Sequence, residues 1–221
     1  MPNKVQLNQD YPIIIESEKL FERAKGLMPA FAQTLAKGPT QYVDGVAPKY
    51  LRRAKGARVW DVDGNEYLDY NSAIGPISLG YGYDAVDDAV RRQLEDGIVF
   101  SLIHPLEVEI AELVREVIPN AESVRFAKAG AEVTSAAVRL ARAYTGRDKV
   151  LCCGYHGWHD WYIGITARNY GVPQAVKDLV FTFNYNDMDS VMAALDENTA
   201  CVILEPMTFD FPKDDFLTKL K

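Results

Sequence analysis

Apolar residues in the first half of the chain recur every three or four positions, the spacing of a helix with one buried face. Pro29, Gly97 and Pro119 follow three such runs, and proline and glycine commonly end helices. Between the first two runs, residues 58–69 alternate apolar and polar around Asp63-Gly64, which predicts a β-hairpin. The predicted helices cover residues 16–28, 84–95 and 105–117, after an extended arm over residues 1–15.

From residue 123 onward the pattern changes to short apolar runs that alternate with helical spacing. Strand–helix–strand repetition requires crossover connections, which predicts an α/β fold with a mainly parallel, doubly wound sheet. We therefore expect a small N-terminal α+β segment over residues 1–75 and an α/β domain over residues 76–221. The predicted strands cover residues 123–127, 149–153, 179–184 and 200–204, and the predicted helices cover residues 131–144, 173–177 and 187–195.

The bulk composition is that of a soluble globular protein, with 48% hydrophobic and 25% charged residues. The net charge of −7 argues against nucleic acid or an anionic membrane surface as the main partner. No apolar run approaches the roughly 20 residues that a membrane-spanning helix needs, and the first residues do not resemble a signal peptide. The three cysteines, two of them adjacent, do not make a disulfide framework, so we expect a cytoplasmic protein.

The first candidate site is the junction at Gly130, where a predicted strand turns directly into a helix. The first N–H groups of such a helix lack intrahelical partners, and with the positive end of the helix dipole they attract a phosphate. Gly130 and Ala131 are small, so an anion can approach the backbone closely. The alternative interpretation is a tight turn without a ligand. Lys128 is the one lysine near this turn that is a candidate for a Schiff base, and it is equally well explained as a solvated side chain.

The second candidate site follows the next predicted strand, where Tyr155 and His156 lie between two glycines. Ligands of open α/β sheets bind beyond the carboxyl ends of the strands, so Tyr155 is expected beside the phosphate turn. A phosphate site next to a stacking aromatic suits a phosphorylated planar heterocycle, and pyridoxal phosphate is the natural candidate. Packing in the core or at its rim is the alternative for Tyr155, and His156 either lines the pocket or supports the loop.

Two apparent metal sites are better explained by local structure. Cys152 and Cys153 are neighbours in a predicted strand and point to opposite faces, so they do not bind one zinc ion together. Asp61 and Asp63 lie near a glycine, but the spacing does not match a calcium-binding loop. The hairpin turn accounts for these carboxylates.

Taken in order, these residues and several further blocks resemble the N-terminal half of class III, fold type I pyridoxal-phosphate enzymes. Within that family the sequence is most similar to the glutamate-1-semialdehyde 2,1-aminomutases. The matching blocks are residues 61–70, 75–76, 79–80, 130, 139–142, 145–149, 155–157, 185–187 and 204–206.

The resemblance implies a fold type I large domain that binds pyridoxal 5'-phosphate. Its phosphate would lie at Gly130 and Ala131 and its ring against Tyr155, with His156 and Glu205 as further cofactor-site residues. The resemblance also implies a homodimer that transfers amino groups on a small amino or carbonyl substrate. The aspartate that pairs with the pyridine nitrogen and the lysine that forms the Schiff base would lie beyond residue 221, so the chain alone is expected to be inactive.

The sequence departs from the aminomutase pattern on the substrate side. Ala73 and Ile74 stand before Gly75-Pro76, where the aminomutases have serine and tryptophan. Ile74 is therefore a candidate substrate residue whose side chain changes the contacts that a substrate would find. An aminotransferase that acts on a sugar or another carbonyl precursor stays open as an alternative. So does, in a different class, a non-catalytic binding or dimerisation module with the same fold.

Overall fold

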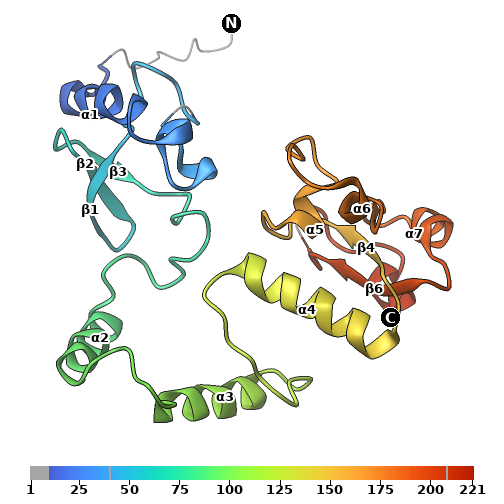
Figure 1. Cartoon of the computed structure of the whole chain (residues 1–221). Helices are drawn as coiled ribbons and strands as arrows, with labels where there is room; N and C mark the ends of the chain where they lie inside the picture. The colour runs from blue at the N-terminus through green and yellow to red at the C-terminus, as the bar shows by residue number, and fades with distance from the viewer. Residues whose placement is uncertain (1–9, 40, 208) are drawn as a thin grey trace, which may run out of the picture. The chain divides into compact units, whose positions relative to one another are not determined.

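The computed structural model describes residues 10–39, 41–207 and 209–221, in two compact units, Met1–His104 and Pro105–Lys221 (Figure 1). We call these the N-terminal unit and the C-terminal unit and describe each by itself. The functional boundary expected at residue 75 stays a prediction.

The N-terminal unit combines short helices with a three-stranded antiparallel sheet in the order β1-β2-β3. The hairpin predicted over residues 58–69 is confirmed as β2 and β3, whereas β1 was not predicted. Its elements are α1 (Ile15–Lys25), the 3-10 helices η1 (Pro29–Phe31) and η2 (Leu35–Lys37), β1 (Leu51–Lys55), β2 (Arg58–Asp61), β3 (Glu66–Leu68) and α2 (Asp84–Asp96).

The hairpin turn supplies the cap of α1. The carboxylate of Asp63 accepts hydrogen bonds from the backbone N–H groups of Glu16 at 2.6 Å and Ser17 at 2.9 Å. These two donors belong to the first turn of α1, where no intrahelical acceptor is available. The helix and the hairpin are therefore joined by one side chain.

Asp61 organises the hairpin itself. It is only 2% exposed and accepts hydrogen bonds from the backbone of Asn65 at 2.8 Å and from the Tyr67 hydroxyl at 2.9 Å. Both turn carboxylates thus have structural partners, in agreement with the hairpin interpretation. No cluster of potential metal ligands occurs among the residues that the structure describes.

The C-terminal unit is an α/β fold around a parallel three-stranded sheet in the order β5-β4-β6. The predicted fold class is confirmed. Its elements are α3 (Pro105–Val117), α4 (Gly130–Thr145), β4 (Lys149–Cys153), α5 (Asp160–Ile163), α6 (Gln174–Lys177), β5 (Val180–Thr182), α7 (Met188–Ala194), β6 (Thr199–Leu204) and α8 (Phe216–Leu220).

Strand β4 lies at the centre of this sheet and is buried on both faces. Val150 and Cys152 face a cluster that includes Trp161, between the sheet, α4 and α5. Leu151 faces a second cluster with Phe216, on the side of α7 and α8. The sheet therefore carries helices on both faces, as a doubly wound fold requires.

The strand predicted over residues 123–127 is wrong. This segment is irregular, and Phe126 is 46% exposed. A strand is stable only when a neighbour completes its hydrogen bonds, and none of the described strands pairs with this segment. Alternating apolar and polar residues show that a segment can form a strand, but they do not show which strand it pairs with.

In the described part of the chain, no helix is both long enough and apolar enough to cross a membrane.

Candidate functional site

Helix α4 presents two backbone donors at its first turn. Ala129 is extended, and its carbonyl accepts hydrogen bonds from the N–H groups of Glu132 at 3.1 Å and Val133 at 3.3 Å. The N–H groups of Gly130 and Ala131 precede these donors and have no acceptor among the residues that the structure describes. Because the helix has 16 residues, its positive dipole end reinforces these two donors.

Gly130 itself has an ordinary helical backbone. It lies outside the left-handed region, and a Cβ atom placed on it would meet nothing within 4 Å. The turn at this position is the first turn of α4. Glu132 in that turn accepts a hydrogen bond from the backbone N–H of Lys128 at 2.9 Å. The side chain of Lys128 is exposed. What the glycine provides is free space in front of the helix end.

The loop after β4 packs directly on this helix end. A Cβ atom on Gly157 would lie 2.5 Å from the Cβ atom of Ala131, and Gly157 has a φ of +104°, so only glycine fits there. The hydroxyl of Thr134 in α4 donates a hydrogen bond to the carbonyl of His156 at 2.9 Å. The structure therefore brings together the two segments that the sequence analysis singled out.

His156 points into the protein. The residue is 6% exposed, and its Nε2 atom lies 2.9 Å from the carbonyl oxygen of Cys153. Because a carbonyl only accepts, Nε2 carries the proton in this contact. The ring also stacks on Trp161 with centroids 5.9 Å apart. Of the two interpretations, this geometry favours support of the loop.

Tyr155 points the opposite way. Its side chain is 65% exposed, and the edge-to-face contact with Tyr162, at 5.7 Å between ring centroids, leaves most of the ring accessible. The backbone N–H of Tyr155 donates a hydrogen bond to Oε2 of Glu205 at 3.0 Å. An exposed aromatic ring on a loop that packs against the start of α4 is a suitable platform for a flat, phosphorylated ligand.

Two hydroxyl residues of α4 were missed by the sequence analysis. Thr134 contacts the loop as described, and Ser135 Oγ lies 2.7 Å from Nδ1 of His159. Ser135 also accepts a hydrogen bond from the indole N–H of Trp161 at 3.0 Å. The available signal was an adjacent pair of hydroxyl residues in a helix otherwise rich in small and apolar residues.

The thiols of the strands offer no nucleophile. Burial, with smaller contributions from the other two cysteines, raises the pKa of Cys152 to about 12. Burial, followed by the charge of Glu205, also raises the pKa of Cys153 above its usual value. A thiol whose pKa is raised stays protonated and unreactive near neutral pH.

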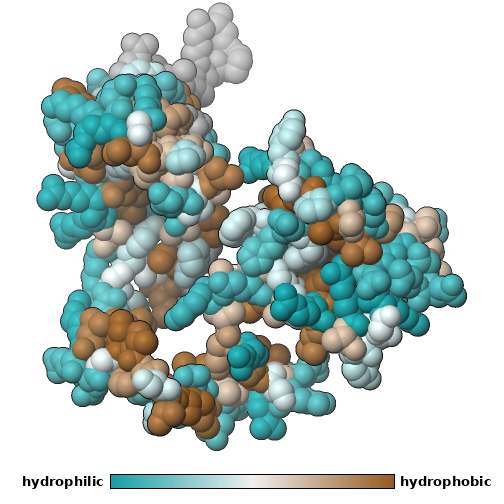
Figure 2. Space-filling view, viewed as in Figure 1, coloured by the Kyte–Doolittle hydropathy of each residue, from teal (hydrophilic) through white to brown (hydrophobic). Residues whose placement is uncertain are grey.

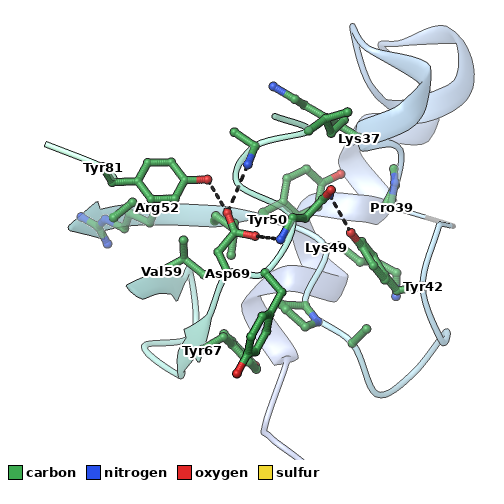
Figure 3. A pocket seen from close by; sticks show the side chains of 18 of the residues that line it. Lys37, Pro39, Tyr42, Lys49, Tyr50, Arg52, Val59, Tyr67, Asp69 and Tyr81 are labelled. Atoms are coloured by element: carbon green, nitrogen blue, oxygen red, sulfur yellow. Dashed lines mark hydrogen bonds between the residues drawn. The ribbon is translucent and has the colours of Figure 1, made fainter. Parts of the chain in front are cut away.

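The N-terminal unit contains a separate cavity of about 810 Å³, shown in Figure 3, and Ile74 is among its lining residues. Asp69 lies at its wall, where its carboxylate accepts hydrogen bonds from the Tyr81 hydroxyl at 2.6 Å and from the backbone of Ala73 at 3.3 Å. The Tyr81 hydrogen bond lowers the pKa of Asp69. Burial, followed by the contact with Asp69, raises the pKa of Tyr81 to about 12.

The turn that carries Ile74 has an unusual backbone. Ser72, Ala73 and Ile74 have φ values of 48°, 55° and 69°, all in the left-handed region. For a β-branched residue such as isoleucine this conformation is strained, and strain of this kind clusters at functional sites. No glycine occupies these three positions, so the conformation could not be predicted from the sequence.

Comparisons with known proteins agree with the resemblance seen in the sequence. The sequence model of the class-III aminotransferase family matches residues 41–221. A 3-aminobutyryl-CoA aminotransferase from Cloacimonas acidaminovorans (strain Evry) is 39% identical over 198 residues, covering 88% of this chain and 47% of that protein. A glutamate-1-semialdehyde 2,1-aminomutase from Acetivibrio thermocellus is 37% identical over 227 residues, covering 93% of this chain and 52% of that protein.

A solved structure described as a transaminase with PLP bound superposes with a TM-score of 0.85 at 29% identity. The superposition covers 95% of this chain and 52% of that one. The chain thus spans about half the length of the curated relatives it matches.

Proposed function

The chain belongs to the class-III aminotransferase family, and from this premise we propose that it forms the cofactor-binding part of a pyridoxal-phosphate-dependent enzyme. The proposed reaction of the full-length protein is transfer of an amino group to or from a small carbonyl substrate. One observation carries the proposal. The unpaired N–H groups of Gly130 and Ala131 lie directly beside a loop that holds Tyr155 at the surface.

The residues present fit the two ends of the cofactor. The phosphate is an anion that matches the unpaired amides of Gly130 and Ala131, and a Cβ atom placed on Gly130 would meet nothing within 4 Å. The exposed face of Tyr155 matches the pyridine ring. When bound, pyridoxal phosphate supplies a reactive carbonyl and a conjugated ring that withdraws electrons from the substrate. The chain's own residues bind and orient that group.

His156 and Glu205 are proposed to act on the same site through the loop. His156 is anchored to the carbonyl of Cys153 and stacked on Trp161, so it holds the loop against α4. Glu205 accepts the N–H of Tyr155. Neither residue has to touch the cofactor to keep the Tyr155 ring where the phosphate site needs it.

Ile74 and its cavity are proposed as the substrate side. The two relatives are named for an amino acyl thioester and for an amino aldehyde, so the names leave the carbonyl substrate open. Ile74 presents an alkyl side chain at the cavity, where it offers no hydrogen bond and no aromatic surface. This favours an aminotransferase with a different substrate over the semialdehyde aminomutase, and a sugar or another carbonyl precursor is the alternative.

We also propose that the full-length protein is a cytoplasmic homodimer. Each of the helices α2 and α3 is without a buried residue along its length. Apolar side chains gather on both, as the brown areas over these helices in Figure 2 show, and such surfaces mark sites of association. Sedimentation of the full-length protein tests this proposal, and a fully active monomer would contradict it.

Two variants of the full-length protein test the cofactor site. Gly130→Val places a branched side chain in the space in front of the helix amides, and Tyr155→Ala removes the ring face. We expect both to lower the fraction of protein that retains pyridoxal phosphate, measured from the cofactor's absorbance after dialysis. The control is Tyr144→Ala, which removes a tyrosine that is 91% exposed near the far end of α4. Retention equal to wild type in both variants would place the cofactor elsewhere.

The 221-residue chain alone distinguishes the enzyme from a binding module. We expect it to show no transamination with pyridoxal phosphate and no stoichiometric pyridoxyl adduct on Lys128 after borohydride reduction and peptide mapping. Full-length protein that binds the cofactor but never turns over would favour the module. Turnover by the chain alone, with an adduct on Lys128, would show that no further lysine is needed.

A further inference from the structure

The side chain of Glu205 contacts backbone rather than open space, and this contact has a consequence for the aromatic platform. We propose that Glu205 is a positioning residue, whose carboxylate holds the N–H of Tyr155 and thereby fixes the direction of the Tyr155 ring. The inference rests on the proposed function in one respect, namely that the ring serves as the platform for the cofactor.

The main chain first brings Glu205 to the loop. Glu205 follows the last residue of β6, and its backbone N–H donates a hydrogen bond to the carbonyl of Cys153 at 3.2 Å. The parallel pairing of β4 and β6 therefore continues one step beyond the strands. As a result the Glu205 side chain begins directly beside the point where the loop leaves β4.

Gly154 then gives that side chain its place. A Cβ atom on Gly154 would lie 2.5 Å from Oε2 and 2.9 Å from Cγ of Glu205. Any other residue would overlap the carboxylate, and the φ of +91° at Gly154 disfavours other residues as well. The glycine and the glutamate are thus complementary, one leaving the space that the other fills.

A second contact holds the same peptide from the Tyr162 side. The Tyr162 hydroxyl donates a hydrogen bond to the carbonyl of Gly154 at 3.0 Å, while the Tyr162 ring meets the Tyr155 ring edge to face. The N–H of Tyr155 is held by Glu205 at 3.0 Å. With both ends of one peptide group held, the direction of the Tyr155 side chain is restricted.

The chemistry of the acceptor predicts how variants rank. A carboxylate that accepts from a backbone N–H makes a charge-assisted hydrogen bond, stronger than a neutral one. Glutamine keeps a carbonyl oxygen at the same position, so Glu205→Gln retains a weaker bond, whereas Glu205→Ala removes the acceptor. The order wild type, glutamine, alanine is therefore expected for every property that depends on the loop.

Hydrogen exchange of the full-length protein without cofactor tests the contact itself. We expect Glu205→Ala to speed exchange of the Tyr155 amide about ten-fold, the loss expected for a hydrogen bond to a charged group, with Glu205→Gln between it and wild type. The matched control is Glu197→Ala, which removes an exposed carboxylate from the turn before β6. Unchanged exchange of the Tyr155 amide in Glu205→Ala would overturn the proposal.

A double-mutant cycle tests whether the effect passes through the ring. We expect Glu205→Ala to weaken the affinity for pyridoxal phosphate about ten-fold in the wild-type background, but by less than two-fold when Tyr155 is already alanine. Equal losses in both backgrounds would show that Glu205 acts on the cofactor directly and would overturn the positioning role. If exchange of the Tyr155 amide responds to Glu205→Ala as expected but the wild-type protein binds no pyridoxal phosphate, the proposed function alone is refuted.

Discussion

Different interactions stabilise each of the two units internally. In the C-terminal unit, apolar clusters on both faces of β4 bury side chains such as Val150 and Leu151 completely. In the N-terminal unit, the buried carboxylate of Asp61 and the cap formed by Asp63 connect the elements. The proposed phosphate site therefore lies beside a close-packed sheet, whereas the Ile74 cavity lies in a unit whose elements are joined by hydrogen bonds to carboxylates.

Close packing transmits small displacements, because few voids are available to absorb them. A hydrogen-bonded network depends instead on the protonation of its acceptors. The comparison therefore predicts that changes of volume matter most in the C-terminal unit and that changes of charge or pH matter most in the N-terminal unit.

The largest expected effect is that of Leu151→Ala. Leu151 is fully buried at the centre of the sheet, so its truncation should lower the free energy of unfolding by about 2–5 kcal/mol. Urea unfolding, monitored by hydrogen exchange of the β4 and β5 amides, measures the loss in the free energy of unfolding. Leu140→Ala, at a position that is 71% exposed on α4, is the matched control. A loss below about 1 kcal/mol would contradict the close packing of the C-terminal unit.

Gly157→Ala is expected to come next. Its new methyl group would overlap Ala131, and the residue must also keep a left-handed backbone, which together should cost about 1–3 kcal/mol. Gly171→Ala is the control, because Gly171 has a φ of +83° with nothing within 4 Å of its Cβ position. Thermal unfolding of both variants separates contact from backbone strain. Equal shifts of the two melting temperatures would contradict the close approach of loop and helix.

Asp63→Ala tests the hydrogen-bonded N-terminal unit. Without the carboxylate, the first N–H groups of α1 lose their acceptor, which should cost about 0.5–2 kcal/mol. Asp63→Asn keeps only one of the two acceptor oxygens and turns its NH2 group toward the other N–H, so it should recover at most part of the loss. Hydrogen exchange of residues in α1 reports the effect locally. Exchange that rises equally in α1 and β4 would show that the two units do not respond separately.

The smallest expected effect is a pH dependence of the N-terminal unit. The pKa of Asp69 is lowered by the Tyr81 hydrogen bond, so this contact contributes stability above the ordinary pKa of 3.8, which is lost as the pH falls further. The pKa of Tyr81 is raised from 10.0 to about 12, so its contribution is complete below pH 10 and is lost as the pH rises through about 12. Tyr81→Phe should flatten both limbs, measured by tyrosine fluorescence and hydrogen exchange of residues 69–81. An unchanged pH profile in this variant would rule out the contact as the cause.

The same division explains how much the sequence could predict. Strand β4 was predicted at its exact bounds because a short apolar run that is buried on both faces leaves an unambiguous pattern. Strand β1, with the sequence LRRAK, was missed because its place depends on backbone pairing with β2 and not on apolar side chains. The strand predicted over residues 123–127 was wrong for the converse reason. Its apolar and polar residues alternate, but none of the described strands pairs with it.

The candidate site was predictable where backbone chemistry is local. A helix start at Gly130 and an aromatic residue between glycines at Tyr155 can be recognised without a structure. The role of Gly154 depends on Glu205, which is 51 residues later, and no local pattern links the two. The left-handed turn at Ile74 was also out of reach, because the residues that adopt it are not those that prefer it.

The cap of α1 has a consequence for the order in which the N-terminal unit forms. Its donors at Glu16 and Ser17 are separated from Asp63 by 47 and 46 residues in sequence. A helix of 11 residues is marginal by itself, and closing so long a segment of chain costs more entropy than closing the short turn of a hairpin. We therefore expect the hairpin to form first, and α1 to become stable only when the hairpin turn contacts its amino end.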